Sequence, residues 1–80
     1  MTPNNVMDTQ RAYAAAKAII DGRDPVAEFS TVLVTAEHAF AALLLACMNG
    51  DARKAAEMLN EGLVPGIEQR LAFYASKEPR

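Results

Sequence analysis

The sequence is poor in the residues from which most chemical sites are built. Its 80 residues include one cysteine and one histidine, and its four glycines are scattered along the chain. A single cysteine excludes an internal disulfide, and scattered glycines exclude a glycine-rich loop that cradles a phosphate. A metal ion needs several ligands at suitable spacing, and the lone histidine has none around it. We therefore expect neither a metal site nor a cofactor.

Long apolar runs and an excess of one charge are also missing. The longest run without a polar residue covers residues 39–48, which is too short to span a bilayer. The chain does not open with a basic segment followed by an apolar one, so we expect no signal peptide. The net charge is −2, which gives no general attraction to nucleic acid or anionic lipid. We expect a cytoplasmic protein that does not bind membranes.

The chain does have alanine-rich segments with clear helix boundaries. Hydrophobic residues make up 51% of it, as in globular proteins. Asn5, Asp24 and Asp51 are typical N-cap residues, and Gly22 and Gly50 are typical of the position just after a helix. These signals predict helices over residues 6–21, 25–49, 52–61 and 65–76.

The boundary near Pro65 has two interpretations. Gly62 favours the end of one helix, and Pro65 favours the start of another. The alternative is one long helix kinked at Pro65, because Val64 is a poor cap. The predicted fold is all-α, a small bundle of three to four antiparallel helices around a long central second helix. It forms a single domain over residues 1–80, with frayed ends at residues 1–4 and 77–80.

The predicted second helix is more apolar than a surface helix should be. Beyond residue 38 it is apolar on every side, and such a helix is buried on every side. Three short neighbours cannot enclose it, so we predict a homodimer with this helix at the interface. The predicted core stripe comprises Val26, Phe29, Leu33, Ala36, Phe40, Leu43, Leu44 and Cys47. The predicted dimer interface comprises Ala41, Ala42, Leu45 and Met48.

The residues that could carry chemistry are not placed to cooperate. His38 and Cys47 are nine residues apart, which puts them on opposite sides of one helix. We predict that His38 is a surface residue and that Cys47 is an inert thiol in the apolar core. Glu57 and Glu61 share their helix face with basic neighbours, which is typical of a solvated surface. No nucleophile with a base can be assembled, so we predict that the protein is not an enzyme.

The C-terminal part suggests two functions. Residues 52–76 look like a helix-turn-helix corner, which would make the protein a DNA-binding transcriptional regulator. However, acids and bases cancel after Gly50, whereas DNA binding needs a positive face. The favoured function is a small homodimeric interaction module, a regulator or adaptor, with Phe73, Arg70 and Lys77 on its partner surface. A small apolar ligand between the helices stays open as a further alternative.

Overall fold

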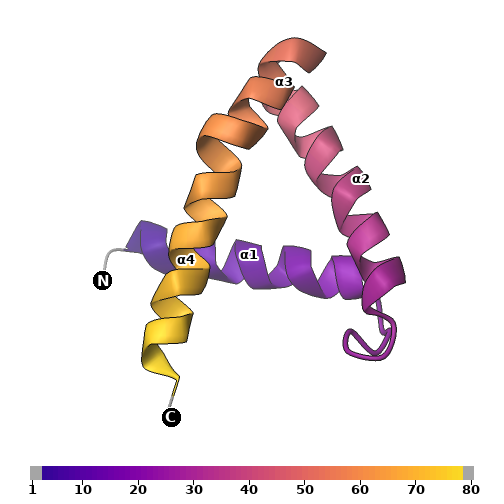
Figure 1. Ribbon diagram of the computed structural model, residues 1–80, viewed down its shortest axis with the longest axis vertical. Coiled ribbons are helices and arrows are strands. Elements are labelled where there is room, and N and C mark those ends of the chain that lie inside the picture. The colour runs from indigo at the N-terminus through magenta and orange to yellow at the C-terminus, as the bar shows by residue number, and fades with distance from the viewer. Residues whose placement is uncertain (1–2, 79–80) are drawn as a thin grey trace. The chain divides into compact units, whose positions relative to one another are not determined.

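The computed structural model describes residues 3–78, with side chains from Val6 onward, and all regular secondary structure in that range is helical. The all-α prediction is therefore confirmed. The chain divides into two compact units, Met1–Phe40 and Ala41–Arg80, and α2 runs from the first into the second. The elements are α1 (Pro3–Ile20), α2 (Phe29–Cys47), α3 (Ala52–Met58), the π-helical turn η1 (Leu59–Leu63) and α4 (Val64–Lys77) (Figure 1).

Helix α1 begins at Pro3, so the predicted cap at Asn5 is wrong. A proline suits the first helical position because the missing N–H would have no partner there anyway. The helix ends at Ile20, and Asp21 and Gly22 follow with φ values of 51° and 74°. The predicted glycine stop is thus confirmed, with an aspartate sharing the left-handed turn.

Arg23 fixes the end of α1 to α2 within the first unit. Its Nε donates to the carbonyl oxygen of Ile20 at 3.0 Å, and its Nη2 donates to that of Ile19 at 2.6 Å. The same Nη2 also donates to Oγ1 of Thr35 in α2 at 3.0 Å. The last carbonyls of a helix have no partner inside it, and a cation there complements the helix dipole.

Helix α2 begins at Phe29, four residues later than predicted. Asp24 does act as a cap, because its Oδ1 accepts hydrogen bonds from the backbone N–H groups of Val26 and Ala27 at 3.0 and 3.1 Å. Oε2 of Glu28 accepts one from the N–H of Asp24 at 3.1 Å. Residues 25–28 form turns, so Asp24 caps a turn and not the helix, and the predicted helix start at Pro25 is wrong.

The second unit contains a tight turn between α2 and α3. Helix α2 ends at Cys47, and Asn49 and Gly50 have φ values of 55° and 81°. Asp51 then caps α3, because its Oδ1 accepts the N–H of Lys54 at 3.1 Å. The predicted turn and cap are both confirmed here.

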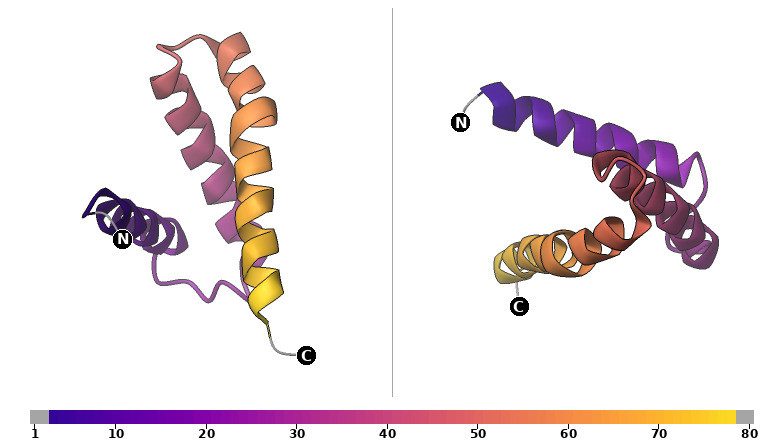
Figure 2. Two further views of the ribbon diagram at one scale, coloured as in Figure 1. Left: turned by 90° about the vertical axis from the view of Figure 1, so that its left-hand side faces the viewer. Right: turned by 90° about the horizontal axis from the view of Figure 1, so that it is seen from above.

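The predicted break before Pro65 is wrong, and the alternative of one long helix is correct. Backbone helix is continuous from α3 to the end of α4 (Figure 2). In the π turn, the N–H of Val64 donates to the carbonyl of Leu59, five residues earlier. Proline lacks an N–H, and its ring collides with the carbonyl four residues before it in an α-helix. A π turn with an extra residue accommodates Pro65 without ending the helix.

The ends predicted to fray are partly helical. Residues 3 and 4 belong to α1, and Lys77 is the last residue of α4. The N–H of Glu78 still donates to the carbonyl of Ala75 at 3.3 Å. Residues 1–2 and 79–80 lie outside the described residues.

Most of the predicted core stripe of α2 is exposed, which corrects the expectation of a buried helix; of its members only Leu44 is buried, and Ala36 is half-buried. Among residues 6–78 only Leu44 and Ala55 are buried, each 8% exposed. Phe29 and Leu33 are 59% and 55% exposed. Two packed helices cover only the residues on the seam between them. Helix α2 is apolar on every side beyond residue 38, so most of its apolar residues stay uncovered. The three- to four-helix bundle is therefore not formed within either unit.

We expect Asp51→Ala to lower the free energy of unfolding by about 1 kcal/mol, because α3 loses the side chain that accepts the N–H of Lys54. Urea unfolding followed by circular dichroism measures this change. Asp51→Asn is the control, since asparagine caps a helix as well as aspartate does. If Asp51→Ala and Asp51→Asn lowered the free energy of unfolding equally, the side-chain hydrogen bond of the cap would contribute nothing to stability.

Candidate functional site

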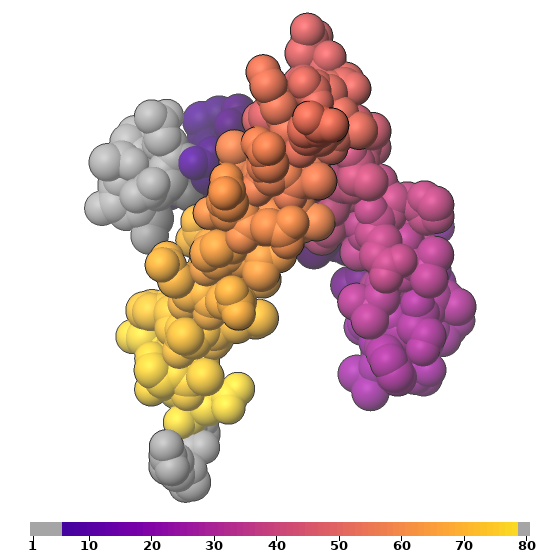
Figure 3. Space-filling view, turned by 45° about the horizontal axis from the view of Figure 1, so that its top comes forward, coloured from indigo at the N-terminus to yellow at the C-terminus, as the bar shows by residue number. Residues whose placement is uncertain are grey.

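The first candidate site is an apolar groove in the second unit. It has a volume of about 250 Å³. The end of α2 and the start of α3 pack together where the groove lies (Figure 3). Its lining is entirely apolar and mostly small: Ala41, Leu44, Leu45, Ala52, Ala55, Ala56 and Leu59.

The groove contains part of the predicted dimer interface. Ala41 and Leu45 line it, and Leu45 is 38% exposed. Ala42 is exposed outside the groove, and Met48 is half-buried at the turn. The structure thus brings two of the four predicted residues together and leaves two apart. Whether a second chain covers them stays a prediction.

Helix α3 and the following Leu59 supply more than half of the residues that line this groove. The signal for a groove is their spacing, because positions three and four apart lie on one face of a helix. The groove residues from this part of the chain are Ala52, Ala55, Ala56 and Leu59.

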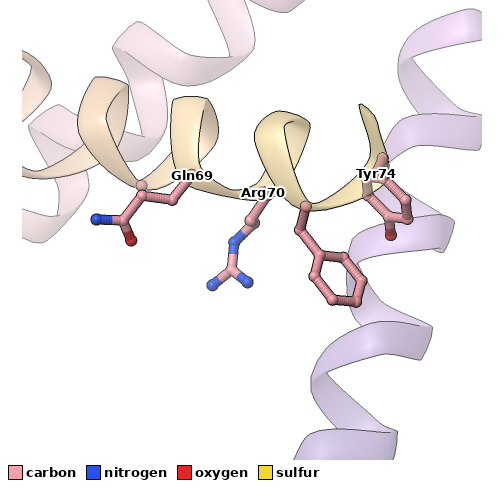
Figure 4. Close-up of a pocket in the computed structure, with 5 residues that line it drawn as sticks. Gln69, Arg70 and Tyr74 are labelled. Carbon is pink, nitrogen blue, oxygen red and sulfur yellow. The ribbon is translucent and has the colours of Figure 1, made fainter. Parts of the chain in front are cut away.

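The second candidate site is a polar and aromatic face of α4. A depression of about 490 Å³ is lined by Gly66, Gln69, Arg70, Phe73 and Tyr74. Gln69, Arg70 and Tyr74 project from the same side of the helix (Figure 4). The Phe73 and Tyr74 rings meet edge to face, with centroids 5.9 Å apart. The site therefore combines a guanidinium, an amide and two aromatic rings.

The predicted partner surface, Arg70, Phe73 and Lys77, lies along this face of α4. The Lys77 ammonium is 5.0 Å from the centroid of the Phe73 ring, within cation–π range. Phe73 is 58% exposed. The one ion pair among side chains 6–78 joins Asp8 and Arg11. Neither cation on the α4 face is thus neutralised, and both can pair with a carboxylate on a ligand.

The residues of catalytic type do not form a site. Cys47 is exposed, so the predicted buried thiol is wrong. The reason is that Leu44 occupies the seam with α3, and Cys47 lies three residues further on, at its edge. His38 is exposed as predicted. Among the described residues, no group of three His, Cys, Asp or Glu side chains is placed to hold a metal ion.

Helix α2 is, by length and composition alone, apolar enough to cross a membrane, with a mean hydropathy of 1.6 over its most apolar window. A mostly buried core helix of a soluble protein and a signal sequence pass the same test, and 6% of this window is buried. Glu37 and His38 lie near the midpoint of Phe29–Cys47. A charged side chain at that depth of a bilayer costs about 2.5–3.5 kcal/mol or more.

The helix-turn-helix corner predicted over residues 52–76 is not present. Backbone helix continues through these residues, so no turn separates a supporting helix from a recognition helix. A DNA-reading role would have depended on that corner.

Comparisons with protein-family models, with curated proteins and with solved structures find no match. The two surfaces described above are therefore the basis for a functional assignment.

We expect Cys47 in the folded protein to react with a thiol reagent nearly as fast as in the unfolded protein, because its side chain is exposed. Cys47→Ser should change the free energy of unfolding by no more than about 0.5 kcal/mol, as for other surface positions. Labelling kinetics with and without urea measure the first effect, and urea unfolding measures the second. Slow native labelling would place the thiol in a covered site.

Proposed function

We propose that the protein is a small non-enzymatic interaction module that forms a homodimer and binds a second protein, as a regulator or adaptor does. The observation that carries the proposal is the exposure of large apolar side chains in the second unit, where only two of residues 41–78 are buried. Nine such side chains are 37–62% exposed: Leu43, Leu45, Met58, Leu59, Val64, Ile67, Leu71, Phe73 and Tyr74.

The energy available from covering these side chains is large. Full burial of one such side chain stabilises a protein by about 1.5–3 kcal/mol, so nine that are roughly half exposed leave about 6–13 kcal/mol unrealised in each chain. Association costs about 4–15 kcal/mol. A core in a chain of this size seldom supplies more than about 3–5 kcal/mol by itself. Two chains that cover each other gain this energy twice, which favours the dimer.

The groove suits a helix from another copy. Alanines at Ala41, Ala52 and Ala56 let a neighbouring helix approach closely, toward the short end of the usual 8–10 Å between helix axes. Charge does not oppose the contact, because residues 51–80 contain five acids and five bases. Two copies that pack in this way complete the antiparallel helical bundle that neither unit forms alone.

The α4 face gives the module its second surface. Arg70 and Lys77 offer unneutralised cations beside the exposed Phe73 ring. A protein segment that carries a carboxylate next to an apolar side chain fits this combination. We favour a protein over a bilayer as the partner because Glu37 lies near the middle of α2, the one helix among the described residues that is both long and apolar enough to span a membrane.

Light scattering should report about twice 8.6 kDa at micromolar concentration. Leu45→Glu should shift the protein to the monomer or unfold it, because the substitution places a carboxylate in the apolar groove. His38→Ala, at an exposed site on the same helix, should stay dimeric with its stability within about 0.5 kcal/mol of the original. A monomeric mass for the unaltered chain would refute the dimer.

Simultaneous Arg70→Ala and Lys77→Ala should leave the dimer mass unchanged and reduce partner capture about tenfold, since charge-assisted hydrogen bonds are lost. Pull-downs with a tagged chain from its native host, quantified by mass spectrometry, measure the capture. The control, Arg53→Ala with Lys54→Ala, removes the same charge from α3. Equal losses in the two double variants would show that charge, rather than the α4 face, governs binding.

A further inference from the structure

The apolar residues after Ala56 follow an unusual spacing. Leu59, Leu63, Ile67 and Leu71 are each four positions apart. On an α-helix four residues turn about 400°, so each step drifts about 40° around the helix axis. Three such steps would carry Leu71 about 120° away from Leu59, and the apolar surface of α4 would diverge from that of α3.

The π turn corrects this drift. Its hydrogen bond from Val64 N–H to Leu59 carbonyl spans five residues instead of four. One extra residue within a turn rotates everything after it back by about 100° relative to an uninterrupted α-helix. The apolar residues of α4 thereby continue the line of those of α3. We name this set the long stripe: Ala52, Ala55, Ala56, Leu59, Leu63, Ile67, Leu71 and Tyr74.

The second unit covers only the first half of the long stripe. Its share of α2 is residues 41–47, which rise about 10 Å, whereas residues 52–77 extend about 39 Å at the same rise per residue. The α2 residues that line the groove beside α3 are Ala41, Leu44 and Leu45. Leu71 and Tyr74, at the other end, are 62% and 59% exposed.

We infer that the long stripe is the surface on which a second copy of this chain docks, and that the π turn makes it continuous. The inference rests on the proposed homodimer and assigns its contact residues. The stripe and the adjoining groove edge supply most of the area that a dimer needs. Five large side chains with roughly 80–150 Å² exposed each supply about 500 Å² of the roughly 800 Å² that a stable interface buries per partner. They are four members of the stripe, Leu59, Ile67, Leu71 and Tyr74, together with Leu45 at the edge of the groove.

The alanines of the stripe and the polar residues beside it supply the remaining area. The chain from residue 51 carries no net charge, since its five acids match its five bases. Two stripes can therefore meet without repulsion. A partner of strong charge would find no complementary charge along the stripe itself, whose members are all apolar or, at Tyr74, neutral.

Thiol accessibility tests the stripe without disturbing the fold. In a Cys47→Ser background, Leu71→Cys places a thiol on the stripe, and Ala72→Cys places one on a neighbouring exposed position turned about 100° away. We expect labelling of the Leu71→Cys variant to slow at least tenfold as the protein passes from monomer to dimer with rising concentration. Labelling of the Ala72→Cys variant should not change. If the two cysteine variants were labelled at equal rates in a proven dimer, the long stripe would not be the contact surface, but the homodimer itself would not be refuted.

Pro65→Ala tests the π turn. Without the proline ring, the segment should form an uninterrupted α-helix, with helix content by circular dichroism kept and the two halves of the stripe turned about 100° apart. We expect its dimer dissociation constant to rise at least tenfold. Pro65→Ala combined with deletion of Glu61 is the control, because removing one residue brings the two halves back into line in an uninterrupted α-helix, so this variant should dimerise as the unaltered chain does. A Pro65→Ala variant that dimerises normally would overturn the role of the turn, whereas an unaltered chain that is monomeric would refute the proposed homodimer itself.

Discussion

Coverage of apolar helix faces is the constraint on which this structure depends. A helix buries only the line of residues that faces a neighbour, and α2 is apolar on every side beyond residue 38. Among residues 41–78 of the second unit only Leu44 and Ala55 are buried, on the seam between α2 and α3. Every other large apolar side chain there is a surface that another helix can cover. The proposal of an interaction module follows from this shortage of covering helices.

Pro65 determines how that surface is arranged. A proline within a helix removes a donor and collides with a carbonyl one turn back, and the chain responds with the π turn at Leu59–Leu63. The same turn brings the four-residue spacing of α4 into line with the alanines of α3. A local response to one proline thus orients the 14 residues of α4. Phe73 and Lys77 lie on a neighbouring side of α4, beside the apolar line to which Tyr74 belongs.

Several features were predictable because they depend on a few adjacent residues. The turn at Gly50 and the cap at Asp51 need only a residue that tolerates positive φ and a side chain that accepts an N–H. The shared face of Arg70, Phe73 and Lys77 follows from their spacing. The bond of Arg23 to Thr35 joins residues 12 positions apart, and no local pattern indicated it. The break at Pro65 was predicted wrongly because Gly62, Val64 and Pro65 are compatible both with a helix break and with one continuous helix. Only the backbone of the folded chain shows that the helix continues.

The sequence by itself determined that this protein is helical and where most turns lie, because alanine content, caps and glycines act within one or two helical turns. It also determined that the chain carries more apolar surface than a few short helices can enclose. Only the tertiary structure decided which of those residues are covered. Cys47 and Leu33 have the apolar spacing of core residues and are exposed, whereas Ala55 is buried. Burial depends on what lies opposite a residue, and spacing within one helix holds no information about its neighbour.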